Sequence, residues 1–324
     1  MGIKNIGVIG VGGVGGYFGG KLCRLQSSGN GINVSFVARG DHLRAIRKSG
    51  LLLSSEDEGD IVCHPALATD DFESLPKLDL CLICVKAFDL ADVLSRLNPI
   101  VSNETVLLPL LNGVDIYSRV RVVIKNGIVL PACVYVGTHV GRPGKVIQQG
   151  GACKILFGPD PMRPNFVPDD FNKLFEQARI KSQWTPDIQT EIWKKFIFIC
   201  PFGLVSAAYD KTLGEILEDD RLRGEAQAVM MEAVCLAHGS GVSLPDDIVE
   251  TSLVKARGFP HEAKTSFQRD YELLDKNDER DLFAGAIIRL AEELSIDVPR
   301  TRAVSTILER KKPAMAVNRC RAMQ

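Results

Sequence analysis

Residues 6–20, with the sequence IGVIGVGGVGGYFGG, decide the fold of this chain. The apolar run at residues 6–9 predicts a buried strand, and residues 17–26 can form a helix directly after the glycines. Residues 10–15 match G-x-G-x-x-G, whose glycines permit a tight turn, close backbone approach to a pyrophosphate, and close helix-to-strand packing. A turn that only joins strand and helix is the structural alternative. We favour a dinucleotide-binding turn made by Gly10, Val11, Gly12, Gly13, Val14 and Gly15.

The size and composition of the chain indicate a globular protein of two domains. It has 324 residues, of which 45% are hydrophobic and 24% charged, and a single core rarely grows to that length. The net charge of −1 creates no field that would attract nucleic acid or an anionic membrane surface. The apolar runs at residues 78–85 and 106–114 are too short for a bilayer span, which needs roughly 20 residues. We therefore expect no nucleic-acid or membrane partner.

The cysteines and histidines argue for a reduced, metal-free protein. Nine cysteines lie mostly in apolar runs without the spacing of a disulfide framework, which is typical of cytoplasmic thiols. The five histidines are far apart in the sequence, so they offer no zinc-binding spacing. We expect a cytoplasmic location and no metal site.

Strand-like and helical patterns divide the chain near residue 186. Short apolar runs at residues 6–9, 34–38, 80–85, 106–110 and 127–136 are typical of parallel strands covered on both faces. Longer helical patterns follow at residues 188–208, 221–239, around 246–248 and 278–295. The predicted fold is α/β: a Rossmann-type doubly wound sheet in residues 1–186, followed by an all-helical domain in residues 187–324. We expect the site in a cleft between these domains.

The end of the second predicted strand indicates which dinucleotide is bound. An acidic residue there would accept a hydrogen bond from the ribose 2′-hydroxyl of NAD, whereas this run, VSFVARG, ends in Arg39. A guanidinium can pair with a 2′-phosphate through two parallel hydrogen bonds. Arg39 therefore favours NADP(H), with a solvated loop charge as the alternative.

Four further segments give the sequence a family resemblance. They are VKA at residues 85–87, LNGV at 111–114, IWKKF at 192–196 and TSFQRD at 265–270. With the glycine turn, this ordered set resembles the ketopantoate reductase (2-dehydropantoate 2-reductase) family over nearly the whole chain. The resemblance implies an NADPH-dependent reductase of a 2-oxo acid.

The resemblance also implies roles for two residues that follow predicted strands. Lys86 would lie near the nicotinamide and the substrate, and so would Asn112. Each has a plain structural alternative, because Lys86 can be a surface lysine at a strand end and Asn112 precedes a glycine in a common turn pair. We expect both residues to bind the cofactor and the substrate.

Helical spacing separates the two adjacent lysines of IWKKF. Ile188, Ile192, Lys195 and Ile199 follow intervals of four, three and four, which places Lys195 on an apolar stripe and turns Lys194 away from it. Partial burial would lower the pKa of Lys195 towards the range useful for acid catalysis; the alternative is an amine that reaches to water. In the resembling family the second lysine of this pattern is the general acid.

The later motifs supply further substrate contacts by resemblance. Ser266 would bind the substrate carboxylate, and an acidic residue further on would bind its hydroxyl; here Glu279 is our choice and Asp278 the rival. Ile199 and Gly203 stand where the best-known bacterial members carry asparagines. This departure weakens the expectation for ketopantoate itself.

The sequence thus predicts reduction of ketopantoate to pantoate, a step of pantothenate and coenzyme A biosynthesis, with Lys195 as the acid. Three alternatives stay open: a reductase of another 2-oxo acid, a related dehydrogenase acting on another hydroxy acid or a sugar phosphate, and an NADP-sensing protein without turnover. The oligomeric state is also open, with a homodimer as one option.

Overall fold

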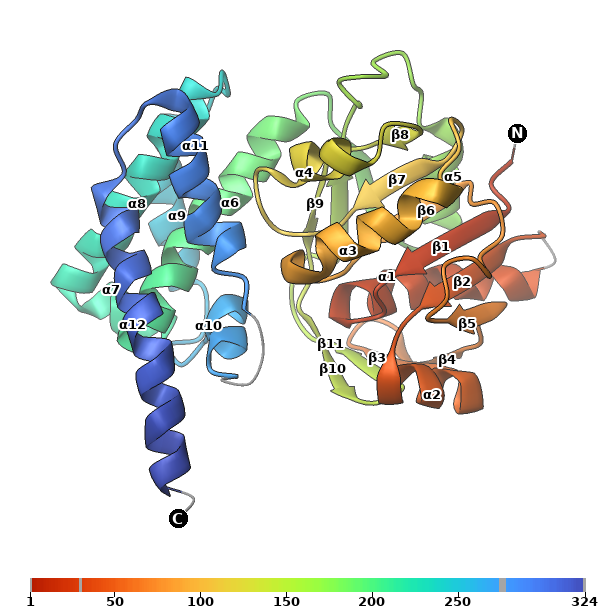
Figure 1. Ribbon diagram of the computed structural model, residues 1–324, viewed down its shortest axis with the longest axis horizontal. Coiled ribbons are helices and arrows are strands. Elements are labelled where there is room, and N and C mark those ends of the chain that lie inside the picture. The colour runs from red at the N-terminus through yellow and green to blue at the C-terminus, as the bar shows by residue number, and fades with distance from the viewer. Residues whose placement is uncertain (1, 29–30, 274–277, 323–324) are drawn as a thin grey trace. The chain divides into compact units, whose positions relative to one another are not determined.

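The computed structural model describes residues 2–28, 31–273 and 278–322. The chain divides into two compact units, Met1–Ile188 and Gln189–Gln324; our expected boundary lay after residue 186. The first unit contains all the strands of the described residues, and the second is built from helices (Figure 1). The predicted class, a Rossmann-type α/β domain followed by a helical region, is confirmed.

The core of the first unit is a six-stranded sheet in the order β5-β2-β1-β6-β7-β8. Its strands are β1 (Asn5–Ile9), β2 (Asn33–Val37), β5 (Leu67–Thr69), β6 (Leu80–Ile83), β7 (Val106–Pro109) and β8 (Ile128–Val129). Every neighbouring pair is parallel. The chain builds outward from β1 on one side and then crosses over to β6, so the strand order reverses between β1 and β6. In such sheets ligands bind at this switch point, beyond the carboxyl ends of the strands.

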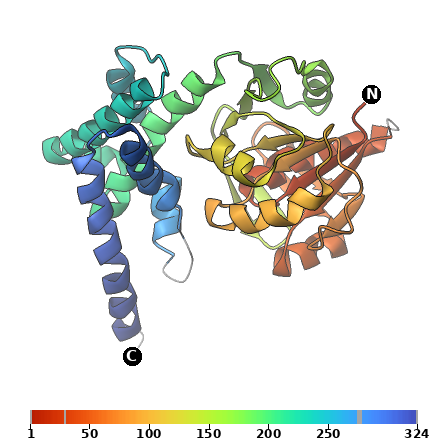
Figure 2. The ribbon, with the colours of Figure 1, turned by 45° about the horizontal axis from the view of Figure 1, so that its top comes forward.

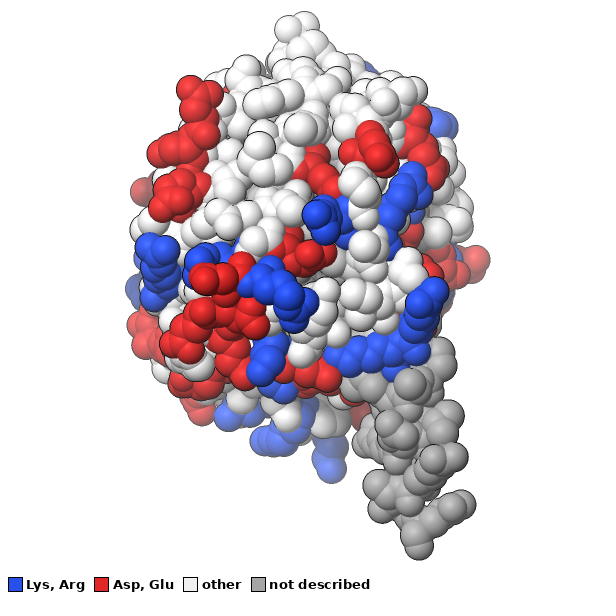
Figure 3. Space-filling model, turned by 90° about the vertical axis from the view of Figure 1, so that its left-hand side faces the viewer, with Lys and Arg blue, Asp and Glu red and all other residues white. Residues whose placement is uncertain are grey.

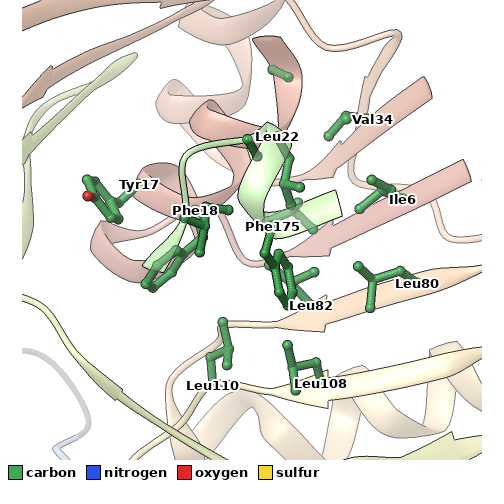
Figure 4. Close-up of a cluster of buried hydrophobic side chains, with 14 of the residues drawn as sticks. Ile6, Tyr17, Phe18, Leu22, Val34, Leu80, Leu82, Leu108, Leu110 and Phe175 are labelled. Carbon is green, nitrogen blue, oxygen red and sulfur yellow. The ribbon is translucent and has the colours of Figure 1, made fainter. Parts of the chain in front are cut away.

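Helices of the first unit complete its layers. They are α1 (Gly13–Cys23), α2 (Gly40–Ser49), α3 (Ala87–Leu97), α4 (Ile116–Val123) and α5 (Asp169–Gln177), with short 3-10 turns at Arg24–Ser28 and Asn98–Ile100. Figure 4 shows Phe18 and Leu22 of α1 and Phe175 of α5 gathered with strand side chains such as Leu82 and Leu108. These side chains are almost fully buried, which fixes α1 and the turn before it against the sheet.

Two smaller sheets were not anticipated from the sequence. One has the order β10-β11-β3-β4 and the other β13-β12-β9. Their strands are β3 (Leu51–Ser55), β4 (Gly59–Cys63), β9 (Ala132–Tyr135), β10 (Thr138–Arg142), β11 (Lys145–Gln148), β12 (Lys154–Phe157) and β13 (Lys181–Trp184). The single strand expected at residues 127–136 was wrong, because β8 and β9 belong to different sheets.

Helix α1 lies between the parallel sheet and the four-stranded sheet, which explains why its glycine run is longer than a nucleotide motif needs. A Cβ on Gly16 would be 2.5 Å from Val146 of β11, and one on Gly20 would be 3.2 Å from Leu53 of β3. On the opposite face, a Cβ on Gly19 would be 3.0 Å from Phe36 of β2. Glycine at these positions lets both sheets approach the helix axis.

The second unit consists of helices throughout its described residues (Figures 1 and 2). They are α6 (Ile188–Tyr209), α7 (Leu213–Glu218), α8 (Asp220–Gly239), α9 (Ile248–Arg257), α10 (Ser266–Tyr271), a π-helical turn (Asp281–Gly285), α11 (Ala286–Leu294) and α12 (Pro299–Ala322). The helix expected at residues 278–295 is thus a π-helical turn continued by α11. Helix α12 was not anticipated.

Helix α6 is the buried centre of this unit. Its length and mean hydropathy of 1.3 would suffice for a membrane span, but 83% of that apolar window is buried inside the protein. Phe196 stacks on Phe283, with ring centroids 6.1 Å apart, and Phe198 stacks on Phe259 at 5.8 Å. These contacts identify α6 as a core helix. Pro201 lies inside this helix, which runs without a break from Ile188 to Tyr209.

Candidate functional site

The three motif glycines of the turn after β1 differ in what the fold requires of them. Gly10 has a φ of +91°, in the left-handed region that favours glycine. A Cβ on Gly15 would collide with the carbonyl oxygen of Gly10, whereas a Cβ on Gly12 would have no atom within 4 Å. The first and third glycines are therefore required by the fold, while the second leaves open space beside the backbone.

That open space lies at the N-terminus of α1. Gly12 is the N-cap, and the N–H of Gly16 donates to the Gly12 carbonyl at 2.8 Å. The N–H groups of Gly13, Val14 and Gly15 precede this first intrahelical bond, and such groups, with the helix dipole, favour an anion. The turn therefore fits the pyrophosphate of a dinucleotide.

We expect Gly12→Ala to fold normally but to weaken dinucleotide binding at least about tenfold, because the added methyl occupies space a pyrophosphate needs. Thermal unfolding and fluorescence titration with NADPH measure the two effects. Gly224→Ala is the control, since a Cβ there also meets nothing within 4 Å and Gly224 lies on α8. Unchanged NADPH affinity in Gly12→Ala would contradict this use of the turn.

Two basic residues follow the strands on either side of β1. Arg39 comes after β2 as the N-cap of α2, and Lys86 comes after β6 as the N-cap of α3. The Arg39 side chain is 78% exposed and pairs with Asp89 of α3, with 2.7 Å between Nη2 and Oδ2. Lys86 is exposed. Both therefore lie at the edge of the sheet that also carries the glycine turn.

Asn112 follows β7 at the same edge. It is half-buried, and Gly113 after it has a φ of +116°, so the turn itself requires a glycine there. Helix α4 begins at Ile116 directly beyond this turn. The first unit thus gathers the glycine turn, Arg39, Lys86 and Asn112 at the carboxyl ends of four neighbouring strands.

In the second unit, α6 carries both adjacent lysines. Lys194 and Lys195 are each half-buried, so burial does not separate them in the way the apolar stripe suggested. Lys194 forms an ion pair with Glu191, 3.0 Å from Nζ to Oε1. The stripe is deeply buried at Ile192 and only partly buried at Ile199. Lys195 therefore lies where a buried face of α6 becomes accessible.

Helix α10 packs directly against α6. A Cβ on Gly203 would be 3.3 Å from Cβ of Phe267, and the hydroxyls of Ser206 and Thr265 are 3.0 Å apart. Ser266, next to both contacts, is exposed at the start of α10. Because residues 195, 199 and 203 share one helix face, the two neighbours of Ser266, Thr265 and Phe267, contact α6 further along the face that bears Lys195.

The two rival carboxylates are both buried, since the Asp278 side chain is 2% exposed, and they differ in their neighbours. Asp278 accepts hydrogen bonds from the backbone N–H and the Nε of Arg280, at 3.0 and 2.9 Å. Glu279 is buried, with 6% of its surface exposed. Phe283, one turn beyond, packs on Phe267 of α10 with ring centroids 5.1 Å apart and on α6 through Phe196. Glu279 therefore belongs to a segment packed against both helices that carry Lys195 and Ser266.

Sequence reasoning missed two charged residues near these groups. One is Asp89, the partner of Arg39. The other is Lys255 of α9, whose Nζ lies 4.5 Å from the ring centroid of Phe198, one turn after Lys195 on α6. Burial lowers the pKa of Lys255 below its usual value. Helical periodicity could have placed both on a helix face, but it does not reveal which neighbouring element that face meets.

Comparisons with known proteins match both units. A family model described as ketopantoate reductase PanE/ApbA matches residues 6–161, and the model of that family's C-terminal part matches residues 187–312. A 2-dehydropantoate 2-reductase of Mesorhizobium japonicum is 27% identical, over 94% of this chain and 97% of that protein. YkpB of Bacillus subtilis, an uncharacterized oxidoreductase, is 26% identical over 93% and 97%.

Solved structures agree with these matches. A PanE/ApbA family ketopantoate reductase from Ralstonia eutropha has a TM-score of 0.86 and 26% identity, covering 97% of this chain and 100% of that one. D-mandelate dehydrogenase, solved with NADH and anilino(oxo)acetate, has a TM-score of 0.83 over 97% of this chain and 100% of that one. Its identity is 16%, so that likeness concerns the fold.

Proposed function

We propose a specific reaction for this chain, which belongs to the ketopantoate reductase family. It reduces ketopantoate to pantoate with NADPH, a step of pantothenate and coenzyme A biosynthesis. The family membership supports an oxidoreductase that uses a nicotinamide cofactor and a small 2-oxo acid. The observation that carries the cofactor part is the glycine turn at the switch point of the parallel sheet, with its open side at Gly12. NADPH, when bound, supplies the hydride for the 2-oxo carbon.

The cofactor part of the proposal uses residues of the first unit. The backbone N–H groups at the start of α1 hold the pyrophosphate, and Arg39 pairs with the 2′-phosphate. Lys86 and Asn112 lie at neighbouring strand ends and contact the nicotinamide end. The proposed cofactor-binding residues are Gly10, Val11, Gly12, Gly13, Val14, Gly15, Arg39, Lys86 and Asn112.

The chemical part assigns the proton to the second unit. Lys195 donates a proton to the oxygen that becomes the hydroxyl of the product, while Lys86 and Asn112 orient and polarise that carbonyl. Ser266 holds the substrate carboxylate and Glu279 its terminal hydroxyl. In support, α6, α10 and the segment of Glu279 pack together around Phe283.

A second candidate is reduction of a more apolar 2-oxo acid. The face of α6 beyond Lys195 carries Ile199 and then Gly203, neither of which has a polar side chain. The contact of Gly203 with Phe267 leaves little room for a larger residue at position 203. This face favours a substrate whose carbon skeleton, rather than its hydroxyl, contacts α6.

The two candidates are separated by comparing ketopantoate with trimethylpyruvate, which lacks only the terminal hydroxyl. We expect oxidation of NADPH with both, and a kcat/KM about 10- to 100-fold higher for ketopantoate, because a hydrogen bond to a charged group contributes about 1.5–3 kcal/mol. Absorbance of NADPH measures the rates. Equal values would favour the apolar substrate, and no oxidation with any small 2-oxo acid would favour an NADP-binding protein without turnover.

Two variants test, in the same assay, which carboxylate binds the terminal hydroxyl of the substrate. Glu279→Gln is expected to reduce the preference for ketopantoate, whereas Asp278→Asn leaves it unchanged because Asp278 is occupied by Arg280. The reverse result would exchange the two roles. Thermal unfolding of both variants shows whether a loss of preference reflects a loss of structure.

The remaining features support a cytoplasmic protein acting on a small molecule. Every cysteine among the described side chains is free, as in a reducing compartment. Figure 3 shows a face of the helical unit on which basic and acidic side chains are interspersed, unlike the single-sign field that attracts nucleic acid. We therefore place the reaction in the cytoplasm.

A further inference from the structure

The Arg39–Asp89 ion pair spans the mouth of the proposed cofactor site. Arg39 follows β2 and Asp89 lies in the first turn of α3, which follows β6. Because β2 and β6 are the two neighbours of β1, the pair crosses the end of the strand that leads into the glycine turn. Both guanidinium Nη atoms donate to the carboxylate, at 2.7 and 3.3 Å.

Stability does not account for this pair. The Arg39 side chain is 78% exposed and that of Asp89 28%, and exposed ion pairs typically contribute only about 0–1 kcal/mol. The charges of the pair do affect the binding of a dinucleotide that carries a 2′-phosphate. Asp89 occupies the guanidinium that a 2′-phosphate would use, and its own negative charge would repel that phosphate.

A carboxylate in this position has the opposite effect on NADH. In dinucleotide-binding folds an acidic residue that accepts a hydrogen bond from the ribose 2′-hydroxyl favours NAD. Here the residue after β2 is the basic Arg39, and the acidic residue, Asp89, comes from α3 instead. The chain therefore presents both an Arg for the phosphate and an Asp for the hydroxyl at one edge of the sheet.

We propose that Asp89 is a determinant of cofactor specificity, which competes with the 2′-phosphate for Arg39 and thereby makes NADH a usable alternative to NADPH. The proposal rests on the proposed function only in requiring that a nicotinamide dinucleotide binds the glycine turn. It needs no assumption about the 2-oxo acid, so it can be tested by binding alone.

Asp89→Asn is expected to raise the preference for NADPH, expressed as the Kd of NADH divided by the Kd of NADPH, about 5- to 10-fold. The amide keeps the size of the side chain but removes the charge that holds Arg39 and repels the phosphate, and 1.4 kcal/mol corresponds to a factor of ten. Fluorescence titration of the full chain with each cofactor measures both constants. An unchanged ratio overturns the proposal.

Three further variants sharpen the test. Asp92→Asn removes the same charge from an exposed position three residues further along α3 and should change the ratio less than about twofold. Asp89→Glu keeps the charge and should retain the Kd ratio of the unsubstituted protein. If Asp89 had only a structural role, its charge would not be expected to determine this ratio. Arg39→Ala should weaken NADPH binding much more than NADH binding; equal effects would remove Arg39, and with it Asp89, from this role.

Two fragments locate the effect and separate it from the proposed function. Adenosine 2′,5′-bisphosphate should bind Asp89→Asn more tightly than it binds the unsubstituted protein. AMP should bind the variant no more tightly, because it lacks the 2′-phosphate and carries the 2′-hydroxyl from which Asp89 can accept a hydrogen bond. An equal tightening for AMP contradicts competition at the 2′ position. Failure of the parent to bind either NADPH or NADH would instead reject the proposed function.

Discussion

Lys195→Ala should lower kcat for reduction of the 2-oxo acid by roughly 10²- to 10⁴-fold, the usual contribution of a positioned general acid. The affinity for NADPH should stay within about twofold, because the proposed cofactor-binding residues belong to the first unit and Lys195 to α6. Lys195 lies where the buried stripe of α6 becomes partly accessible, as a proton donor to a bound substrate must. Steady-state rates and NADPH titration measure the two quantities.

The adjacent lysine provides a matched control. Lys194 is also half-buried and on the same helix, but its ammonium is paired with Glu191, so Lys194→Ala should change kcat less than about threefold. A small primary amine added to Lys195→Ala should restore part of the rate, which a general loss of structure would not allow. Equal losses in the two variants, without rescue, would refute the assignment of the acid.

The parallel sheet was predictable because its strands are buried on both faces. Consecutive apolar residues at 6–9, 80–83 and 106–108 leave few alternatives to a central strand. The smaller sheets were not predictable in this way, since β4 and β10 are largely exposed and β10 carries no apolar run. The strand expected at residues 127–136 is divided into β8 and β9 at Pro131. Proline has no backbone N–H to donate to a neighbouring strand, and this signal for a break was missed.

The candidate site was predictable to the extent that topology alone determines it. Residues that follow parallel strands share one edge of the sheet, so Arg39, Lys86 and Asn112 could be grouped from the sequence. Asp89 could not be linked to Arg39, because an acidic residue in the first turn of a helix is common on electrostatic grounds alone. The burial of Lys194 was missed for a related reason. Periodicity defines the faces of a helix, but the packing of neighbouring elements decides which faces are covered.

Asp160→Asn should cost the first unit about 3–5 kcal/mol of unfolding free energy, the usual effect of removing one member of a buried ion pair. Asp160 is fully buried and pairs with Arg121 of α4, which is 9% exposed. The carboxylate also accepts hydrogen bonds from the Tyr117 hydroxyl at 2.8 Å, and from the backbone N–H groups of Val129 and Met162 at 2.9 Å.

This network ties α4 to β8 and to the segment after β12, and α4 begins just beyond the Asn112 turn. An amide keeps the shape of Asp160 but leaves the Arg121 charge buried without its partner, so the loss should appear as a lower urea midpoint for unfolding of this unit. Glu104→Gln, which breaks an exposed pair with Lys77, should leave the midpoint unchanged. If both substitutions had the same small effect, the buried pair would be dispensable, and the anchoring of the Asn112 turn would have to come from the apolar side of α4, where Ile116 and Val120 are buried.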